Sequence, residues 1–183
     1  MIDLLLWFMA FFQTLATLNL SKNNINAVGI EYLAIALQNN TGLKALDLWD
    51  NNIGARGAQH LANALQNNST LTTLNVGWNE IDITGIEHLA NALQNNNTLK
   101  SLDLGWNNIE NECAQHLTEA LRKNSTLVTM VLVENKLNAV GAKYIANGLQ
   151  DNSTLVELDL CWNTIDIEGA KYLADALQYN SVR

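Results

Sequence analysis

Apolar residues recur in one fixed arrangement along nearly the whole chain, and each copy of the arrangement spans 28 residues. The copy at residues 99–109 reads LKSLDLGWNNI and has the form L-x-x-L-x-L-x-x-N-x-I. The first leucine of this motif occurs six times without an insertion between copies: Leu15, Leu43, Leu71, Leu99, Leu127 and Leu155. A fixed period of this length predicts six similar structural units that stack on one another.

Each unit contains two hydrophobic periods. Leu102 and Leu104 alternate with polar residues, which is the spacing of a strand. Ala114, Leu117 and Leu121 have the spacing of one helix face. We therefore expect a short strand, a turn and a helix of about three turns in every unit. One unit buries too few apolar side chains to fold alone, so its neighbours must complete its core.

Stacking also predicts the shape of the molecule. Strands in a sheet lie about 4.8 Å apart, whereas packed helices need about 8–10 Å. The stack must therefore curve, with a parallel sheet on the concave side and the helices on the convex side. The predicted fold class is α/β, a right-handed solenoid that forms an open arc. The expected repeats are 15–42, 43–70, 71–98, 99–126, 127–154 and 155–183.

Residues 1–14, MIDLLLWFMAFFQT, do not carry the strand motif. Their run of nine apolar residues is too short to span a bilayer, and no basic residue precedes it. Shifted by one period, Leu5 and Met9 align with Leu33 and Leu37 of the first helix. We interpret residues 1–14 as an apolar helical cap, the degenerate helix of a preceding repeat. A targeting segment is the alternative.

The helical half of the repeat is more specific than its strand motif. It reads GIEYLAIAL at 29–37, GAQHLANAL at 57–65 and GIEHLANAL at 85–93. Together the two halves resemble the ribonuclease-inhibitor subtype of leucine-rich repeat, over residues 15–182. Similar repeats occur in ribonuclease inhibitor, in NOD-like receptors and in the Ran GTPase-activating protein. The resemblance implies a horseshoe whose concave side and adjoining loops bind proteins. One departure is that ribonuclease inhibitor often places Cys where this chain has Asn.

Asparagine fills two further columns of the repeat. In the first, an Asn ends every strand, where a buried amide can pair the backbone groups that the sheet leaves open. This predicted asparagine ladder consists of Asn23, Asn51, Asn79, Asn107, Asn135 and Asn163. In the second, an Asn follows every helix, where we expect the left-handed conformation of a C′ residue. These residues are Asn40, Asn68, Asn96, Asn124, Asn152 and Asn180.

The candidate binding surface follows from the alternation of side chains along a strand. Positions 3, 5 and 7 of the motif are expected on the concave face, and position 8 at its rim. Large aromatic residues with a polar border are typical of a protein-binding hot spot. The candidate residues are Asp47, Trp49, Asp50, Trp78, Asp103, Trp106, Val131, Val133, Glu134, Asp159 and Trp162. The alternative is that the tryptophans lie flat over the loops and shield the asparagine ladder.

Composition narrows the range of partners. The formal net charge of −8 argues against nucleic acid or an anionic membrane and favours a basic protein partner. Cys113 lies in a helical half and Cys161 on a strand, too far apart to form a disulfide. Two unpaired thiols indicate a reducing compartment, which predicts a cytoplasmic location.

The sequence contains no motif typical of a catalytic, cofactor or metal site. All three histidines, His60, His88 and His116, share one helix column, but adjacent helices are too far apart for a shared metal ion. There is no phosphate loop, no nucleophile–base–acid set and no glycine-rich cofactor fingerprint. We therefore expect no enzymatic activity, no cofactor and no metal site.

Three functional hypotheses remain. The first is a protein-interaction module that binds a protein or peptide on its concave face. The second is a GTPase-activating regulator, for which the chain offers only Arg56, Arg122 and Arg183. The third is an assembly unit that associates end to end through its exposed core ends.

Overall fold

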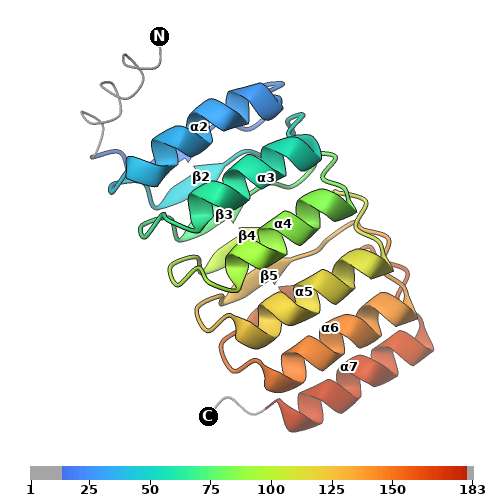
Figure 1. Ribbon diagram of the computed structural model, residues 1–183. Helices are drawn as coiled ribbons and strands as arrows, with labels where there is room; N and C mark the ends of the chain where they lie inside the picture. Colours follow the sequence, from blue (N-terminus) through green and yellow to red (C-terminus); the bar gives the residue numbers. More distant parts are fainter. Residues whose placement is uncertain (1–13, 181–183) are drawn as a thin grey trace.

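The computed structural model describes residues 14–180, which form six strands alternating with six helices. The strands are β1 (Thr17–Asn19), β2 (Ala45–Asp47), β3 (Thr73–Asn75), β4 (Ser101–Asp103), β5 (Thr129–Val131) and β6 (Glu157–Asp159). The helices are α2 (Ala27–Asn39), α3 (Gly54–Leu65), α4 (Ile83–Leu93), α5 (Asn111–Lys123), α6 (Ala139–Asp151) and α7 (Ile167–Tyr179). The helices stack side by side along the molecule (Figure 1).

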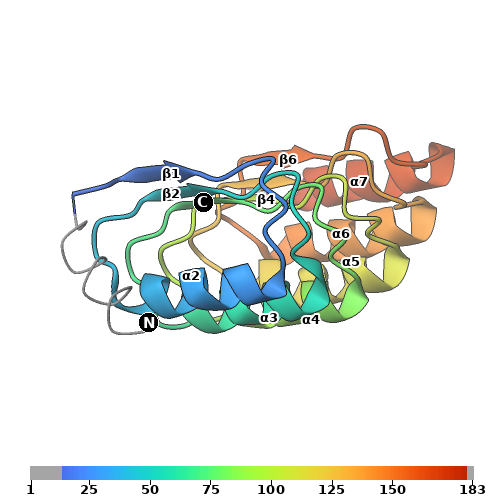
Figure 2. The same cartoon turned by 90° about the horizontal axis from the view of Figure 1, so that it is seen from above.

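The strands form one parallel sheet in the order β1-β2-β3-β4-β5-β6. Each residue pairs with the residue one repeat away; Leu74, for example, lies opposite Leu102. The sheet makes one layer and the helices make the other (Figure 2). The predicted solenoid of six parallel strand–helix units is confirmed. The proposed cap at residues 1–14 lies outside the described residues apart from Thr14, and it stays a prediction together with the repeat boundaries.

The core lies between the two layers, as the apolar columns predict. In the fourth repeat Leu102, Leu104, Ile109, Ala114 and Leu117 are fully buried. Four of the six described helices begin at a side-chain cap: Asn26, Asp82, Asn138 and Asp166 each accept a backbone N–H of the first turn. No helix among residues 14–180 is both long enough and apolar enough to cross a membrane.

The strand-end asparagines form the predicted ladder. Asn107 is 1% exposed, and its Nδ2 donates to the carbonyl oxygens of Val76 (2.9 Å) and Leu104 (3.2 Å). Its Oδ1 accepts the backbone N–H groups of Asn79 (3.0 Å) and Ile81 (3.1 Å). The amide therefore ties together the ends of strands in two neighbouring repeats.

The prediction for the helix-end asparagines is wrong. Asn40 and Asn124 have φ values of −84° and −77°, so the backbone is extended there and not left-handed. Asn96 is 3% exposed; its Nδ2 donates to Leu65 O (2.7 Å), and its Oδ1 accepts the N–H of Leu99 (2.8 Å). These residues form a second buried asparagine ladder, because an amide that pairs both the preceding helix end and its own turn must face inward.

Candidate functional site

Three of the tryptophans lie next to one another on the strand-end side of the arc. The ring centroids of Trp49 and Trp78 are 5.4 Å apart, with the ring planes at 86°. Those of Trp78 and Trp106 are 5.2 Å apart and nearly parallel, at 9°. We call Trp49, Trp78 and Trp106 the tryptophan row. It spans three consecutive repeats, and its two contacts have the edge-to-face and stacked geometries that aromatic rings prefer.

The backbone at position 8 directs two of these side chains, Trp78 and Trp106. All six position-8 residues have a positive φ, between 50° and 61°. They are Lys22, Asp50, Trp78, Trp106, Glu134 and Trp162. The backbone N–H of Trp106 donates to Val133 O (2.8 Å), and that of Trp78 donates to Gly105 O (2.9 Å). These bonds hold the chain at the point where it leaves the sheet. A left-handed conformation is unfavourable for a bulky side chain, so the fold maintains it against a local cost.

Glycine next to the row makes room for its first ring. A Cβ added to Gly77 would lie 2.9 Å from Cδ1 of Trp49 and 3.2 Å from Gly105 O. Trp49 therefore lies against the Gly77 backbone and is half-buried. Trp78 and Trp106 are 45% and 43% exposed, so much of each ring faces solvent. The three rings thus differ: the first covers the loop beneath it, and the other two remain largely open.

Carboxylates line the concave side of the row. Asp47 Oδ1 accepts the N–H of Trp49 (3.0 Å), and Asp103 Oδ1 accepts that of Gly105 (2.8 Å). Burial raises the pKa of the Asp103 carboxyl, the Gly105 N–H opposes the change, and the charges of Asp47 and Asp159 add to it. The three carboxylates of the concave face therefore lie near enough for their charges to affect one another.

A second set of carboxylates borders the outer edge. The side chains of Asp50, Glu80 and Glu134 make no ion pair or hydrogen bond with any residue of the described part, 14–180. Lys22, in contrast, holds its Nζ 5.0 Å from the centroid of the Trp49 ring. Neither Lys22 nor Glu80 is among the binding residues predicted from the sequence. Their signal was present, because Lys22 is in the position-8 column and Glu80 is two residues after Trp78.

The remaining candidate residues are more widely separated on the surface than the sequence predicted. Val131 on β5 lies in register between Asp103 and Asp159, and it is half-buried, as is Val133. Trp162 is 79% exposed, and no ring contact to it occurs within residues 14–180. The fifth repeat places Glu134 between Trp106 and Trp162. The structure therefore brings three tryptophans together and leaves the fourth apart.

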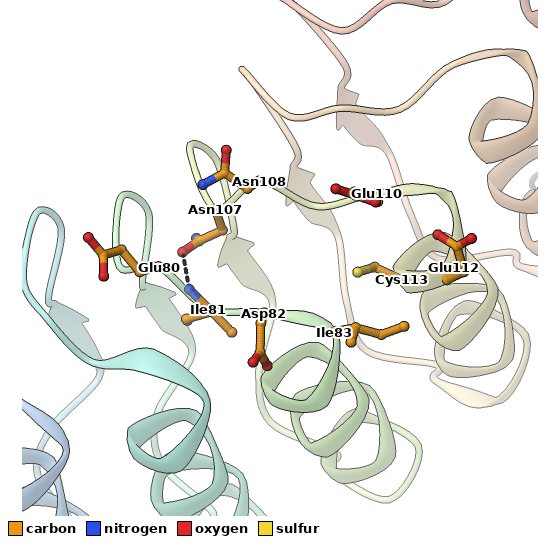
Figure 3. Close-up of a pocket in the computed structure, with 9 residues that line it drawn as sticks. All are labelled: Glu80, Ile81, Asp82, Ile83, Asn107, Asn108, Glu110, Glu112 and Cys113. Carbon is orange, nitrogen blue, oxygen red and sulfur yellow. Dashed lines mark hydrogen bonds between the residues drawn. The ribbon is translucent and has the colours of Figure 1, made fainter.

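A pocket of about 580 Å³ opens between α4 and α5 (Figure 3). It is lined by Glu80, Ile81, Asp82, Ile83, Asn107, Asn108, Glu110, Glu112 and Cys113. Cys113 occupies the column that holds glycine in the other repeats, and its side chain points from α5 into this pocket (Figure 3). Elsewhere glycine allows close approach; a Cβ on Gly85 would lie 3.1 Å from Cα of Ala55. The thiol accordingly separates α4 from α5, which contact each other less than other neighbouring helices do.

The pocket has little reactive chemistry. Burial raises the pKa of the Cys113 thiol, which therefore stays protonated at neutral pH. Among residues 14–180 no three His, Cys, Asp or Glu side chains are grouped so that they could hold a metal ion. Of the arginines, Arg122 pairs with Glu119 (3.3 Å) and Asp151 (3.0 Å) on the helical side, far from the tryptophan row.

Solved structures share this fold. A structure described as leiomodin-1 actin-binding site 2 is 18% identical, with a TM-score of 0.55 and coverage of 98% of this chain and 89% of that chain. The tropomodulin C-terminal domain of Caenorhabditis elegans is 14% identical, with a TM-score of 0.62 and coverage of 98% and 92%. No curated protein matches the chain.

The repeats themselves match a known family. A model described as Leucine Rich repeat matches residues 13–34, 39–62, 67–90, 95–118 and 151–174, which together exceed half of the chain. The unmatched stretch between residues 118 and 151 contains β5, where valines replace the usual polar and small residues. The chain belongs to the leucine-rich repeat family, and its strand–turn–helix units are of the ribonuclease-inhibitor type.

Proposed function

We propose that this protein is a non-catalytic interaction module that binds a basic segment of a partner protein over the tryptophan row. The observation that carries the proposal is the stacked pair of Trp78 and Trp106, which stays about half exposed on a left-handed backbone. A bulky residue with positive φ costs of the order of 1–2 kcal/mol. Asn or Gly would avoid that cost, and Asn already occupies left-handed positions in this chain at Asn24 and Asn108. The presence of tryptophan at two such positions therefore supports a binding role.

The surrounding charge favours a basic partner. Asp47, Asp103 and Asp159 lie on the concave side, while Asp50 and Glu134 border the rim without ion pairs of their own within residues 14–180. Exposed indoles bordered by carboxylates offer both apolar contact and attraction to a cation. Cys113 and Cys161 are free thiols, which fits the proposed cytoplasmic location.

The test replaces two rings without disturbing the backbone. In Trp78→Asn/Trp106→Asn the asparagines retain the left-handed conformation, so the fold should persist while the aromatic surface is lost. Partner capture from lysate would be compared for wild type, this double variant and Tyr32→Gln, which removes an exposed aromatic on α2. We expect capture to be lost only in the double variant, with circular dichroism unchanged in all three proteins.

Cross-linking to the captured protein locates the contact. Lys22 lies beside the tryptophan row, whereas Lys171 lies on α7. Cross-links should concentrate at Lys22; a partner that is retained by the double variant, or that links to Lys171 instead, contradicts the proposal. Actin is worth including as one purified partner, because the leiomodin-1 domain is described as an actin-binding site.

A second candidate function is self-association through the last described repeat. A groove of about 450 Å³ lies between β6 and α7, lined mainly by leucines, and Val156 and Leu177 are 79% and 71% exposed. We propose that a second copy of the chain packs apolar residues against this groove. Sedimentation velocity should then show a concentration-dependent larger species that disappears in Leu177→Glu. A single monomeric species at high concentration would reject this candidate.

A further inference from the structure

One end of the tryptophan row already holds a cation. Lys22 comes from the repeat before Trp49, and its ammonium lies 5.0 Å from the ring centroid. This distance lies within the range of a cation–π interaction. The arrangement shows how a basic side chain can pack against this row: it approaches from the neighbouring repeat and covers the outer ring.

At the opposite end of the row, no cation lies over the Trp106 ring within residues 14–180. One face of Trp106 stacks on Trp78, so the other face turns towards the fifth repeat. There the position-8 residue is Glu134, with φ of 50° and its N–H bonded to Cys161 O (2.9 Å). Glu134 has a left-handed φ like that of Trp106, so its side chain leaves the backbone at the corresponding point of the next repeat. It has no ion pair within residues 14–180.

The floor beside this end is apolar. Val131 and Val133 are half-buried and follow the concave side of the fifth repeat. Val131 has Asp103 on one side and Asp159 on the other in the sheet register. Gly105 is buried beside Val133; an added Cβ there would lie 3.2 Å from Val133 O and 3.7 Å from Val133 Cβ. A long aliphatic stem can therefore lie on the valines while its charged end reaches the carboxylates and the indole.

We infer that the partner places an arginine side chain at the junction of the fourth and fifth repeats, with its guanidinium over Trp106 and paired with Glu134. The inference rests on the proposed function and specifies its ligand. Arginine fits better than lysine, because a planar guanidinium stacks on an indole while it donates two parallel hydrogen bonds to a carboxylate. It is also less strongly hydrated, so less is lost when it leaves water.

The probes are three blocked peptides, acetyl-(Gly-Arg)4-amide and its lysine and citrulline counterparts, titrated into the full chain by isothermal calorimetry. Citrulline keeps the shape of arginine without its charge. We expect the arginine peptide to bind at least about fivefold more tightly than the lysine peptide, and the citrulline peptide not to bind measurably. In nuclear magnetic resonance spectra the Trp106 indole N–H signal should shift with the arginine peptide.

Two charge variants test the assignment to Glu134. Glu134→Gln should weaken the arginine peptide about tenfold and remove its advantage over lysine. Glu87→Gln, the same change on the exposed side of α4, should leave binding unaltered. Equal affinity for arginine and lysine, an unaffected Glu134→Gln variant, or no binding of any peptide would overturn the inference.

These variants also distinguish a failure of the arginine assignment from a failure of the proposed function. If Glu134→Gln binds normally while Trp78→Asn/Trp106→Asn does not, the arginine assignment fails and the proposed surface stands. If the double tryptophan variant keeps both the peptides and the cellular partner, the proposed function itself fails.

Discussion

The two asparagine columns occupy opposite ends of every repeat and hold their turns in different ways. At the strand end, Asn107 bonds to backbone groups of the preceding repeat, including Val76 O and the N–H groups of Asn79 and Ile81. At the helix end, Asn96 donates to Leu65 O in the preceding repeat but accepts from its own turn, at Leu99 N. The first column mainly joins repeats, and the second also shapes a turn.

This difference explains why only one column was predicted correctly. An asparagine after a strand has few roles other than pairing open backbone groups. An asparagine after a helix can either adopt a left-handed C′ conformation or fold its amide into the turn, and both are common for this residue. In the structure the Oδ1 accepts two N–H groups of its own turn, as Asn96 does from Thr98 (3.0 Å) and Leu99 (2.8 Å), so the amide stabilises the turn.

The largest effect is expected at the strand end. Asn107→Ala would leave at least Val76 O, Asn79 N and Ile81 N buried without their partner. Each such group costs about 1–3 kcal/mol, so unfolding in urea should show a loss of about 3 kcal/mol or more. A loss below about 1 kcal/mol would mean that water replaces the amide and that the ladder is not needed.

A pair of glycine variants distinguishes the two interpretations of the helix-end column. Asn96→Gly removes a buried amide from its turn, and we expect a loss of about 2 kcal/mol in thermal or urea unfolding. Asn108→Gly is the matched control, because Asn108 is exposed and has a φ of 56°. There glycine should be neutral or slightly stabilising. If Asn96→Gly behaves like the control, the helix-end asparagine is left-handed in solution after all.

A smaller effect is expected from the hydroxyl that supports the helix-end turn. Thr98 Oγ1 donates to Asn68 O (3.3 Å), which links consecutive members of that column. Thr98→Val keeps the shape and removes this bond, so the free energy of unfolding should fall by about 0.5–1 kcal/mol. Thr84→Val, at an exposed position of α4, should change it much less.

The smallest effect concerns charge on the strand side. Because the pKa of Asp103 is raised by burial, the folded protein binds this proton more tightly than the unfolded chain does. The tighter proton binding therefore stabilises the folded protein at pH values below the ordinary pKa of an aspartate. This stabilisation is lost as the pH rises through the raised pKa of Asp103. Asp103→Asn should be more stable than wild type at pH 7 by less than about 1 kcal/mol, and equal to it near pH 3.

Asn75 shows that this substitution preserves the local structure. It occupies the same column, and its Oδ1 accepts Gly77 N at 2.9 Å, as Asp103 does for Gly105. Unfolding followed between about pH 3 and pH 8 measures the difference. A variant that is less stable than wild type at pH 7 would show that the Asp103 charge is favourable in the fold.

The sequence by itself determined the architecture. The 28-residue period gives the number of repeats, and the alternation of Leu102 and Leu104 and the helical spacing of Ala114 and Leu117 identify strand and helix. These patterns are readable because each depends on residues within one repeat. The strand-end ladder was predictable for the same reason, since every strand must end with open backbone groups.

Only the tertiary structure decided how neighbouring repeats meet. The contact of Trp78 with Trp106, the position of Lys22 over Trp49 and the separation of α4 from α5 by Cys113 all join residues from different repeats. At five of the six position-8 residues the backbone N–H donates to the next repeat, so stacking supports the positive φ there. A periodic sequence specifies what each repeat contributes, but the direction of a side chain at the rim depends on the repeat beside it.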